Sequence, residues 1–204
     1  MTMRMVPLIG AALLLAACGP LVQLGGNAPA PDALLTLRSA APPPDYDGPT
    51  ALADTLGIAV PDVPAELQTL RLPVQVTDAT VQYLAGASWS EQPNRQFQRL
   101  LADTLAGAGV PVLDTRGGSI APARQLTGHL REFGLDVRPS LANAPVVRVR
   151  YDAQLAGPRG AGTVALKSFV VEEPASSDQP AAVAAALNRA ANRLAGEVAA
   201  WVKG

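Results

Sequence analysis

Cysteine and histidine, the residue types most often used for covalent, acid–base and metal chemistry, are scarce in this sequence. The 204 residues include one cysteine, Cys18, and one histidine, His129. A single cysteine cannot form a disulfide framework, and with one histidine it cannot build a conventional zinc cluster. No serine or acidic residue stands in a catalytic motif with His129, so we interpret it as a structural side chain and predict no metal site.

Three further segments contain residue types of a catalytic motif without its full pattern. The stretch 85–89 around Ser88 lacks the second glycine of a G-x-S-x-G nucleophile turn. The glycine-rich loop 157–162 lacks the Lys-Ser/Thr pair of a phosphate-binding loop. Glu172 and Glu173 are adjacent on a predicted strand, where neighbouring side chains point to opposite faces. The sequence therefore predicts a protein that is not an enzyme, with no catalytic residues and no cofactor.

The charge balance bears on the class of partner. Sixteen basic and seventeen acidic residues give a formal net charge of −1, so the chain has no basic field to hold nucleic acid. Hydrophobic residues make up 49% and charged residues 16%, which indicates a folded chain and not a disordered one.

The surroundings of Cys18 predict a different chemistry for its thiol. Arg4 precedes an uncharged run, residues 5–17, which is typical of a secretory signal and too short to span a bilayer. The run ends Leu-Ala-Ala-Cys, which resembles the lipobox of bacterial lipoproteins, where the thiol accepts a diacylglyceryl group. We predict cleavage between Ala17 and Cys18, so that residues 1–17 are the signal peptide and Cys18 is the lipidated N-terminus. An ordinary signal peptide with an incidental cysteine is the alternative.

The residues after Cys18 are expected to connect the lipid anchor to the domain. Residues 18–32 show no regular hydrophobic periodicity, and we interpret them as a flexible tether with a reach of about 20 Å. Residue 19 is Gly and not Asp. By analogy with the sorting rule of enteric bacteria, this favours the periplasmic face of the outer membrane, with the inner membrane as the alternative.

The positions 33–204 have the hydrophobic patterning of an α+β domain. Alternation of apolar and polar residues, bounded by Gly and Pro, predicts strands at 33–38, 55–60, 67–76, 80–84, 110–113, 125–137, 146–155 and 164–171. The last three are separated by loops of a length that predicts an antiparallel meander.

Two segments show the period of an amphipathic helix instead. One begins near Pro93, with serines just before it as expected capping residues, and ends at Gly107–Gly109. The other runs from Pro180 past Trp201. The expected architecture is an antiparallel-rich sheet with two main helices packed on one face.

Several of these segments together resemble one protein family. The stretch Val81–Pro93, preceded by Leu67–Arg71 and followed by a helix with Leu100 and Leu101, resembles the ABC-type transport auxiliary lipoprotein family. Its most specific positions here are Tyr83, Gly86, Trp89 and Pro93, which we call the signature residues. The segment 126–133 and the Ala-rich final helix ending at Trp201 also match, so the resemblance covers about residues 33–203.

The resemblance implies a function that composition alone does not. Members of the family accompany an ABC permease, an ATPase and an MCE-domain (mammalian cell entry) protein, and these systems move lipids or other hydrophobic molecules across the cell envelope. The implied role is a non-catalytic periplasmic subunit that docks the MCE-domain protein, and a homo-oligomer would be compatible with a symmetric MCE assembly. The alternatives are a lipid-binding carrier and, ranked last, a cell-envelope hydrolase using Ser88 or His129.

Trp89 is the signature residue with two opposed interpretations. It could be an exposed aromatic that docks a partner, or it could fill the core where a strand meets a helix. We favour the core position, because tryptophan side chains are largely buried on average.

Overall fold

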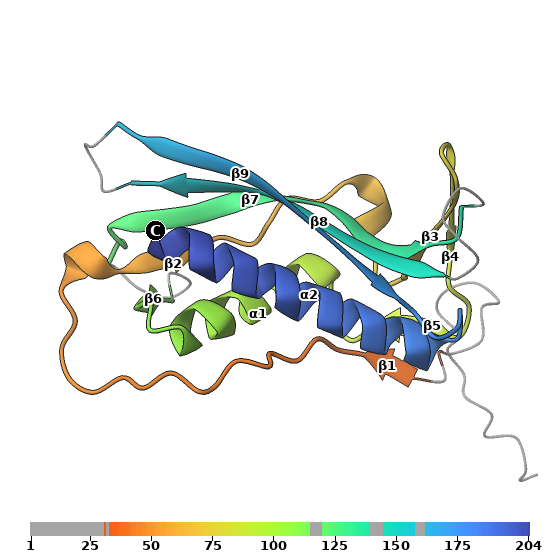
Figure 1. Cartoon of the computed structure of the whole chain (residues 1–204), viewed down its shortest axis with the longest axis horizontal. Coiled ribbons are helices and arrows are strands. Elements are labelled where there is room, and N and C mark those ends of the chain that lie inside the picture. The colour runs from red at the N-terminus through yellow and green to blue at the C-terminus, as the bar shows by residue number, and fades with distance from the viewer. Residues whose placement is uncertain (1–30, 32, 115–119, 139–144, 158–161) are drawn as a thin grey trace, which may run out of the picture. The chain divides into compact units, whose positions relative to one another are not determined.

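Three long strands from the second half of the chain form the largest part of the sheet. Strands β7 (Arg124–Asp136), β8 (Val146–Ala156) and β9 (Val164–Pro174) pair antiparallel in chain order (Figure 1). The expected meander is therefore confirmed. The register shifts between Leu130 and Glu132, where a bulge changes which residues face the core.

The computed structural model describes residues 31, 33–114, 120–138, 145–157 and 162–204. These residues belong to one compact unit, 31–204. The predicted signal peptide, with the processing site Ala17–Cys18, lies outside the described residues, as does the tether apart from Pro31.

Short strands from the first half of the chain run parallel along the other edge of β7. β2 (Leu56–Ile58) pairs with the start of β7, and β3 (Pro73–Thr77) pairs with its end. β6 (Val112–Leu113) continues the sheet beside β2, and β4 (Thr80–Tyr83) beside β3. The sheet is thus mixed: its long ladders are antiparallel, and its parallel pairings are two or three residues long.

One predicted strand is shorter than its sequence pattern. The alternation over 67–76 predicts one strand, but η2 (Ala65–Leu67) is a 3-10 helix and the strand β3 begins only at Pro73. A proline has no N–H for the sheet, so it is tolerated as the first residue of a strand. Another 3-10 helix, η1 (Leu52–Asp54), precedes β2.

A separate two-stranded sheet connects the N-terminal end of the described domain to the signature residues. β1 (Ala33–Leu35) pairs in parallel with β5 (Ala87–Trp89), so that Leu35 lies opposite Trp89. Both of these side chains are buried in the core.

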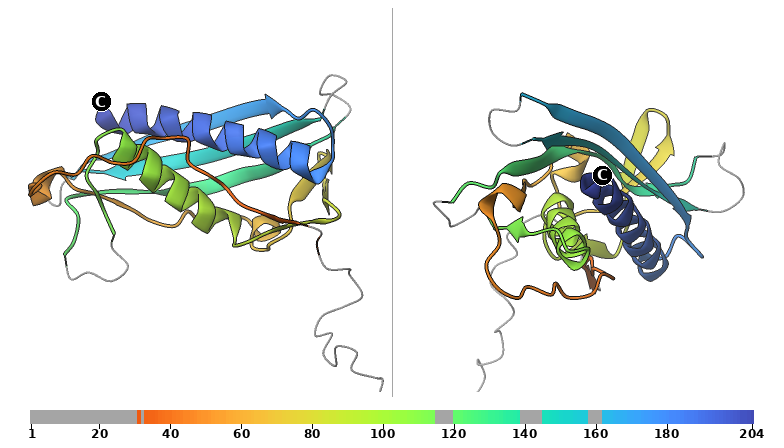
Figure 2. Two further views of the ribbon diagram at one scale, coloured as in Figure 1. Left: turned by 90° about the horizontal axis from the view of Figure 1, so that it is seen from below. Right: turned by 60° about the vertical axis from the view of Figure 1, so that its left-hand side comes forward.

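Both helices pack on one face of the large sheet, which confirms the predicted α+β architecture (Figure 2). α1 (Pro93–Gly107) contacts β2 and β6, and α2 (Pro180–Lys203) lies against β8 and β9. The face of α2 that its sequence period predicts is buried: Val183, Leu187, Ala191, Leu194 and Val198. No helix in the described part of the chain is long and apolar enough to cross a membrane.

Residues 36–44, here called the strap, cross the helix pair on the side away from the sheet (Figure 2). Two side chains of α2 hold it: Asn188 Oδ1 accepts a hydrogen bond from Arg38 N at 2.8 Å, and Asn192 Oδ1 accepts one from Ala40 N at 2.7 Å. Asn192 Nδ2 donates in return to the Arg38 carbonyl at 2.8 Å. The two asparagines satisfy backbone groups of the strap that no strand partner serves.

Gly107, the last residue of α1, lies so close to the strap that a larger residue there should displace it. A Cβ on Gly107 would lie 2.5 Å from the carbonyl oxygen of Pro42, so Gly107→Ala should displace the strap although alanine favours a helix over glycine by about 1 kcal/mol. Hydrogen exchange should then show faster exchange at the Arg38 and Ala40 amides. Gly196→Ala in α2 is the matched control, because its Cβ would meet nothing within 4 Å. Unchanged protection in Gly107→Ala would refute the close contact.

Candidate functional site

The four signature residues lie along one continuous path from β4 to α1. Tyr83 ends β4, Gly86 lies in the turn, Trp89 ends β5, and Pro93 is the first residue of α1. Gly86 has φ 70°, a left-handed conformation that glycine adopts without the steric cost of a Cβ. The turn therefore explains why a glycine suits this position.

Trp89 lies in the aromatic part of the core. Its side chain is 1% exposed, and its ring centroid lies 5.5 Å from that of Phe133. Phe97 of α1 extends the cluster, with centroid distances of 6.4 Å to Phe133 and 5.4 Å to Tyr151. Trp89 Nε1 is buried and has no hydrogen-bond partner among the described residues. The described structure thus places Trp89 where the packing interpretation expects it, and no surface is left on the ring for a partner.

The start of α1 differs from the expected serine capping. Gln92 occupies the N-cap position and makes no side-chain cap hydrogen bond, while Pro93 is buried. The buried Gln96 serves this end instead: its Oε1 accepts from Leu37 N at 2.8 Å, and its Nε2 donates to the Glu91 carbonyl at 2.8 Å. Gln96 therefore joins the strap to the residues between Trp89 and Pro93, a role that its sequence position did not reveal.

Tyr83 makes a surface contact with a cation. The Arg71 guanidinium carbon lies 4.2 Å from the centroid of the Tyr83 ring, in the geometry of a cation–π interaction. Tyr83 is half-buried and Arg71 is exposed. Tyr83 ends β4, which lies at the same end of the domain as β1 and β5 (Figure 1).

The two side chains of the hydrolase alternative have different partners. Ser88 Oγ donates to the carbonyl of Leu70 at 3.3 Å or to that of Trp89 at 3.4 Å. His129 Nδ1 lies 3.9 Å from Asp62 Oδ2, and both side chains are exposed to solvent. No contact joins Ser88 to His129, and within the described ranges no group of His, Cys, Asp and Glu could hold a metal ion.

The adjacent carboxylates Glu172 and Glu173 and the glycine-rich loop 157–162 are the two other segments with residue types of a catalytic motif. Glu172 faces Arg148 on the sheet, whereas Glu173 pairs with Arg193 of α2, so the adjacent carboxylates lie on opposite faces as expected. Of the glycine-rich loop 157–162, residues 158–161 lie outside the described part of the chain.

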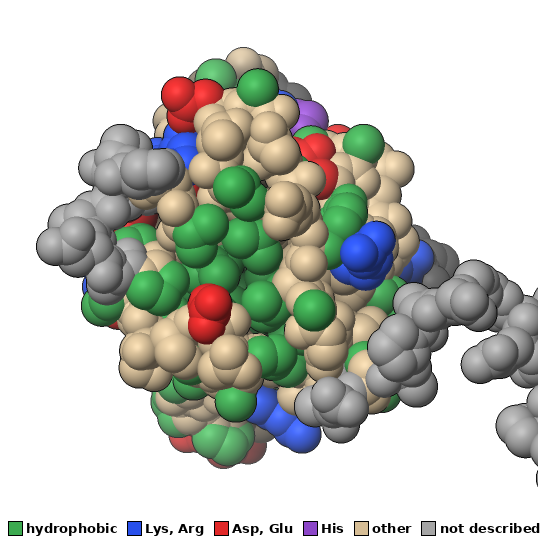
Figure 3. Space-filling model, turned by 90° about the vertical axis from the view of Figure 1, so that its right-hand side faces the viewer, with side chains coloured by type: hydrophobic (Ala, Val, Ile, Leu, Met, Phe, Trp, Pro, Cys, Tyr) green, Lys and Arg blue, Asp and Glu red, His purple; other side chains and the backbone are tan. Residues whose placement is uncertain are grey.

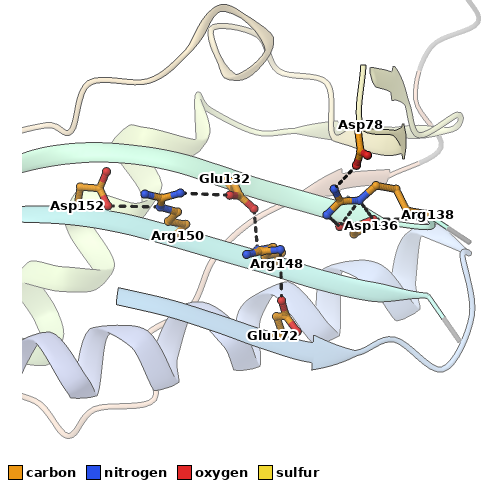
Figure 4. A network of polar contacts seen from close by, with 8 residues as sticks. All are labelled: Asp78, Glu132, Asp136, Arg138, Arg148, Arg150, Asp152 and Glu172. Carbon is orange, nitrogen blue, oxygen red and sulfur yellow. Dashed lines mark hydrogen bonds and ion pairs between the residues drawn. The ribbon is translucent and has the colours of Figure 1, made fainter. Parts of the chain in front are cut away.

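Charged side chains of alternating sign cover the face of the sheet opposite the helices (Figure 4). Arg148 lies 2.8 Å from Glu132 and 3.4 Å from Glu172. Arg150 lies 4.0 Å from Glu132 and 3.4 Å from Asp152. The Ser168 hydroxyl, followed by the guanidinium groups of Arg131 and Arg150, lowers the pKa of Asp152. The arginines and carboxylates neutralise each other, so this face has little surplus charge for an ionic ligand.

A second charged group lies where β7 ends beside the β3–β4 hairpin (Figure 4). Arg138 binds the buried Asp136 at 2.6 Å and the exposed Asp78 at 2.7 Å. Burial is the largest influence on Asp136 and alone would raise its pKa, but the hydrogen bonds and charge of Arg138 outweigh it and lower the pKa. A neighbouring cavity of about 420 Å³ has a mixed lining. Leu67, Val81 and Phe133 are among its apolar residues. Its charged residues are three arginines and three carboxylates: Arg131, Arg138, Arg148, Glu66, Glu132 and Asp136.

The Asp136–Arg138 pair should make stability sensitive to acid. A carboxyl group whose pKa is lower in the folded state than its unfolded value of 3.8 stabilises the fold above that pH. This stabilisation disappears as the pH falls through the folded pKa. Asp136→Asn should therefore lower the urea midpoint at pH 7 and flatten the acid-induced decrease below about pH 4. Asp103→Asn, on an exposed position of α1, should change neither; equal acid profiles for Asp136→Asn and the wild type would disprove the linkage.

Comparisons with solved structures identify proteins that share this fold. A Xanthomonas campestris protein of the DUF330 family superposes with a TM-score of 0.65 at 22% identity, covering 84% of this chain and 92% of that one. A second solved structure, described as an uncharacterized protein, has a TM-score of 0.62 at 15% identity, covering 83% and 99%. These likenesses show a shared fold.

Family membership comes from the sequence itself. No curated protein matches the chain. The family model of the ABC-type transport auxiliary lipoprotein component matches residues 35–199, a range that contains all four signature residues, both helices up to residue 199 and the whole of the large sheet. The chain belongs to the ABC-type transport auxiliary lipoprotein family.

Proposed function

We propose that this protein is the lipid-anchored periplasmic auxiliary subunit of an MCE-type ABC transport system. In that system it would dock the MCE-domain protein while the permease and ATPase move lipids or other hydrophobic molecules across the envelope. The observation that carries the proposal is the family match over residues 35–199.

The arrangement of the polar side chains supports a non-catalytic role. Ser88 and His129 have separate partners, and the arginines on the open face of the sheet are engaged with carboxylates of the same domain. The signature residues Gly86, Trp89 and Pro93 form a turn, a core contact and a helix start. These roles build a stable shape for another protein to bind, and they do not assemble a reaction centre.

The proposed location follows from the N-terminal sequence. Lipidation of Cys18 would hold the domain at a membrane, and Gly19 favours the outer membrane over the inner one. Two or more acyl chains make such anchoring stable, since each buried CH₂ contributes about 0.8 kcal/mol.

Affinity purification of the tagged, lipidated protein in a mild detergent tests the proposal. We expect an MCE-domain protein to copurify, together with permease and ATPase, and native mass spectrometry of the same sample reports whether the subunit is a homo-oligomer. Absence of the MCE-domain protein under these conditions would count against the docking role. Phospholipid bound to the protein after detergent exchange would instead favour the carrier alternative. An adjacent gene for an MCE-domain protein is the corresponding genomic expectation.

A further inference from the structure

We propose that the end of the domain next to the tether docks directly onto the phospholipid bilayer, through Leu34 and Leu70 with Arg71 binding a lipid phosphate. This inference rests on the proposed lipid anchor at Cys18 and adds a defined orientation to it. Leu34, Leu70, Arg71 and Tyr83 are here called the docking end.

The two leucines lie on either side of β5 and point away from the core. Leu34 lies opposite Ser88 in the β1–β5 pair, while its neighbour Leu35 is buried. On the other edge of β5, the Leu70 carbonyl accepts a hydrogen bond from Trp89 N at 2.7 Å. Leu34 is 65% exposed and Leu70 is 43% exposed. Two large apolar side chains therefore meet solvent above a rigid, hydrogen-bonded support.

The surface around these elements carries exposed apolar side chains, among them Leu34, Leu70 and Val81. Figure 3 shows the end of the molecule that carries β1, β3, β4 and β5, where hydrophobic side chains gather over a continuous area with few charged side chains among them. A contiguous apolar patch on a domain surface generally marks a contact with a protein or a membrane.

Arg71 supplies the complementary charge for a lipid headgroup. Within the described residues Arg71 has no carboxylate partner, unlike Arg131, Arg138 and Arg148, whose guanidinium groups form ion pairs. Its contact with the Tyr83 ring holds the guanidinium at the surface. Arginine donates well to phosphate oxygens, and tyrosine favours the boundary between headgroups and acyl chains.

The covalent path to the anchor brings this end to the membrane. Pro31 lies two positions before Ala33, the first residue of β1, and only twelve residues, 19–30, separate it from the predicted lipidated N-terminus, Cys18. The thirteen peptide links from Cys18 to Pro31 span at most about 45 Å when fully extended, and an unconstrained chain of that length spans about 20 Å. The opposite end of the domain lies a full length of α2 away, about 36 Å for its 24 residues. The bilayer is therefore the large apolar partner that the anchor holds within reach of the docking end.

Fluorescence of the full lipidated protein in vesicles of phosphatidylethanolamine and phosphatidylglycerol tests the inference. The thiol of Cys18 is consumed by lipidation, so a cysteine introduced at the exposed Ala85 can be labelled alone with an environment-sensitive nitrobenzoxadiazole dye. The same label at the exposed Ala200, near the end of α2, is the positional control. We expect the emission of the dye at position 85 to shift to the blue on reconstitution, and the dye at position 200 to remain in water.

A double substitution then tests the leucines themselves. Leu34→Ser with Leu70→Ser should lower the ratio of docked to undocked protein about tenfold, equivalent to about 1.4 kcal/mol, while the thermal unfolding midpoint stays unchanged because both side chains are exposed. Leu166→Ser is the matched control: Leu166 is 71% exposed near the start of the edge strand β9, and that end of β9 lies away from β1 and β5 (Figure 1).

The outcomes separate this inference from the proposed function. Protein that fails to float with the vesicles contradicts the anchor, and the inference with it. If the protein floats with the vesicles but the dye at position 85 stays in water, only the docking end is contradicted. A blue shift that persists in the Leu34→Ser, Leu70→Ser variant also contradicts the docking end alone. Protection of that dye only after an MCE-domain partner is added would also overturn the inference, because it would assign the surface to a protein.

Discussion

Replacement of Trp89 by alanine should lower the free energy of unfolding by about 3–5 kcal/mol, the usual cost of removing a large aromatic side chain from a core. Trp89 is 1% exposed and contacts Phe133 across 5.5 Å between ring centroids. Its removal would leave a cavity where β5, α1 and the large sheet meet. Urea denaturation followed by circular dichroism measures the effect.

Two further variants show what the indole contributes. Trp89→Phe should cost less than Trp89→Ala, because the smaller ring still fills part of the space and the unpartnered buried Nε1 is removed. Leu166→Ala, at a 71% exposed position, should change the stability by about 0.5 kcal/mol or less. If Trp89→Ala kept its stability but lost its partner, the residue would have to be a docking aromatic and the core assignment would fail.

Cys18→Ser should abolish lipidation and remove the protein from the outer-membrane fraction. A serine hydroxyl does not take the diacylglyceryl group, so the precursor should keep residues 1–17 or be mislocalised. Sucrose-gradient fractionation gives the location of the protein, and intact mass spectrometry reports both the acyl chains and the processing. Because two or more acyl chains supply stable anchoring, we expect a nearly complete change and not a graded one.

Gly19→Asp is the matched control for the anchor, since it retains Cys18 and should still be lipidated. By the sorting rule of enteric bacteria, this variant should move to the inner membrane. Unchanged outer-membrane placement of Cys18→Ser would contradict the lipid anchor, whereas unchanged placement of Gly19→Asp would contradict only the sorting rule.

The parts of the fold that follow from local patterns could be predicted from the sequence. The buried face of α2 repeats at the helical period, and β8 alternates almost perfectly, so both were recognisable from a few neighbouring residues. Pro93 suited a first helical position and begins α1. Each of these features is decided within one element, which is why pattern alone was sufficient.

Features decided between distant segments could not be predicted. The parallel pairings of β2 and β3 with β7 join residues far apart in the chain, and nothing in three-residue strands specifies such partners. The segment 67–76 alternates like one strand, but the tertiary structure divides it between a 3-10 helix and β3. Short periodic runs are ambiguous for this reason.

The candidate site shows the same division. Tyr83, Gly86, Trp89 and Pro93 are close in sequence and form one path in the structure. The residues that hold the strap could not be predicted from local sequence, because their partners are far away in the chain. Asn188 and Asn192 lie on α2 and bind the strap about 150 positions away in the sequence.

The route of the chain through β1 and the strap also decides how the domain would respond to mechanical load. A pull applied at the N-terminal end first stresses the three-residue pairing of β1 with β5, next the hydrogen bond from Leu37 N to Gln96, and then the side-chain hydrogen bonds of Asn188 and Asn192. The long ladders of β7, β8 and β9 bear the force only after these connections have yielded. The N-terminal segment can therefore detach in stages under force while the large sheet stays folded.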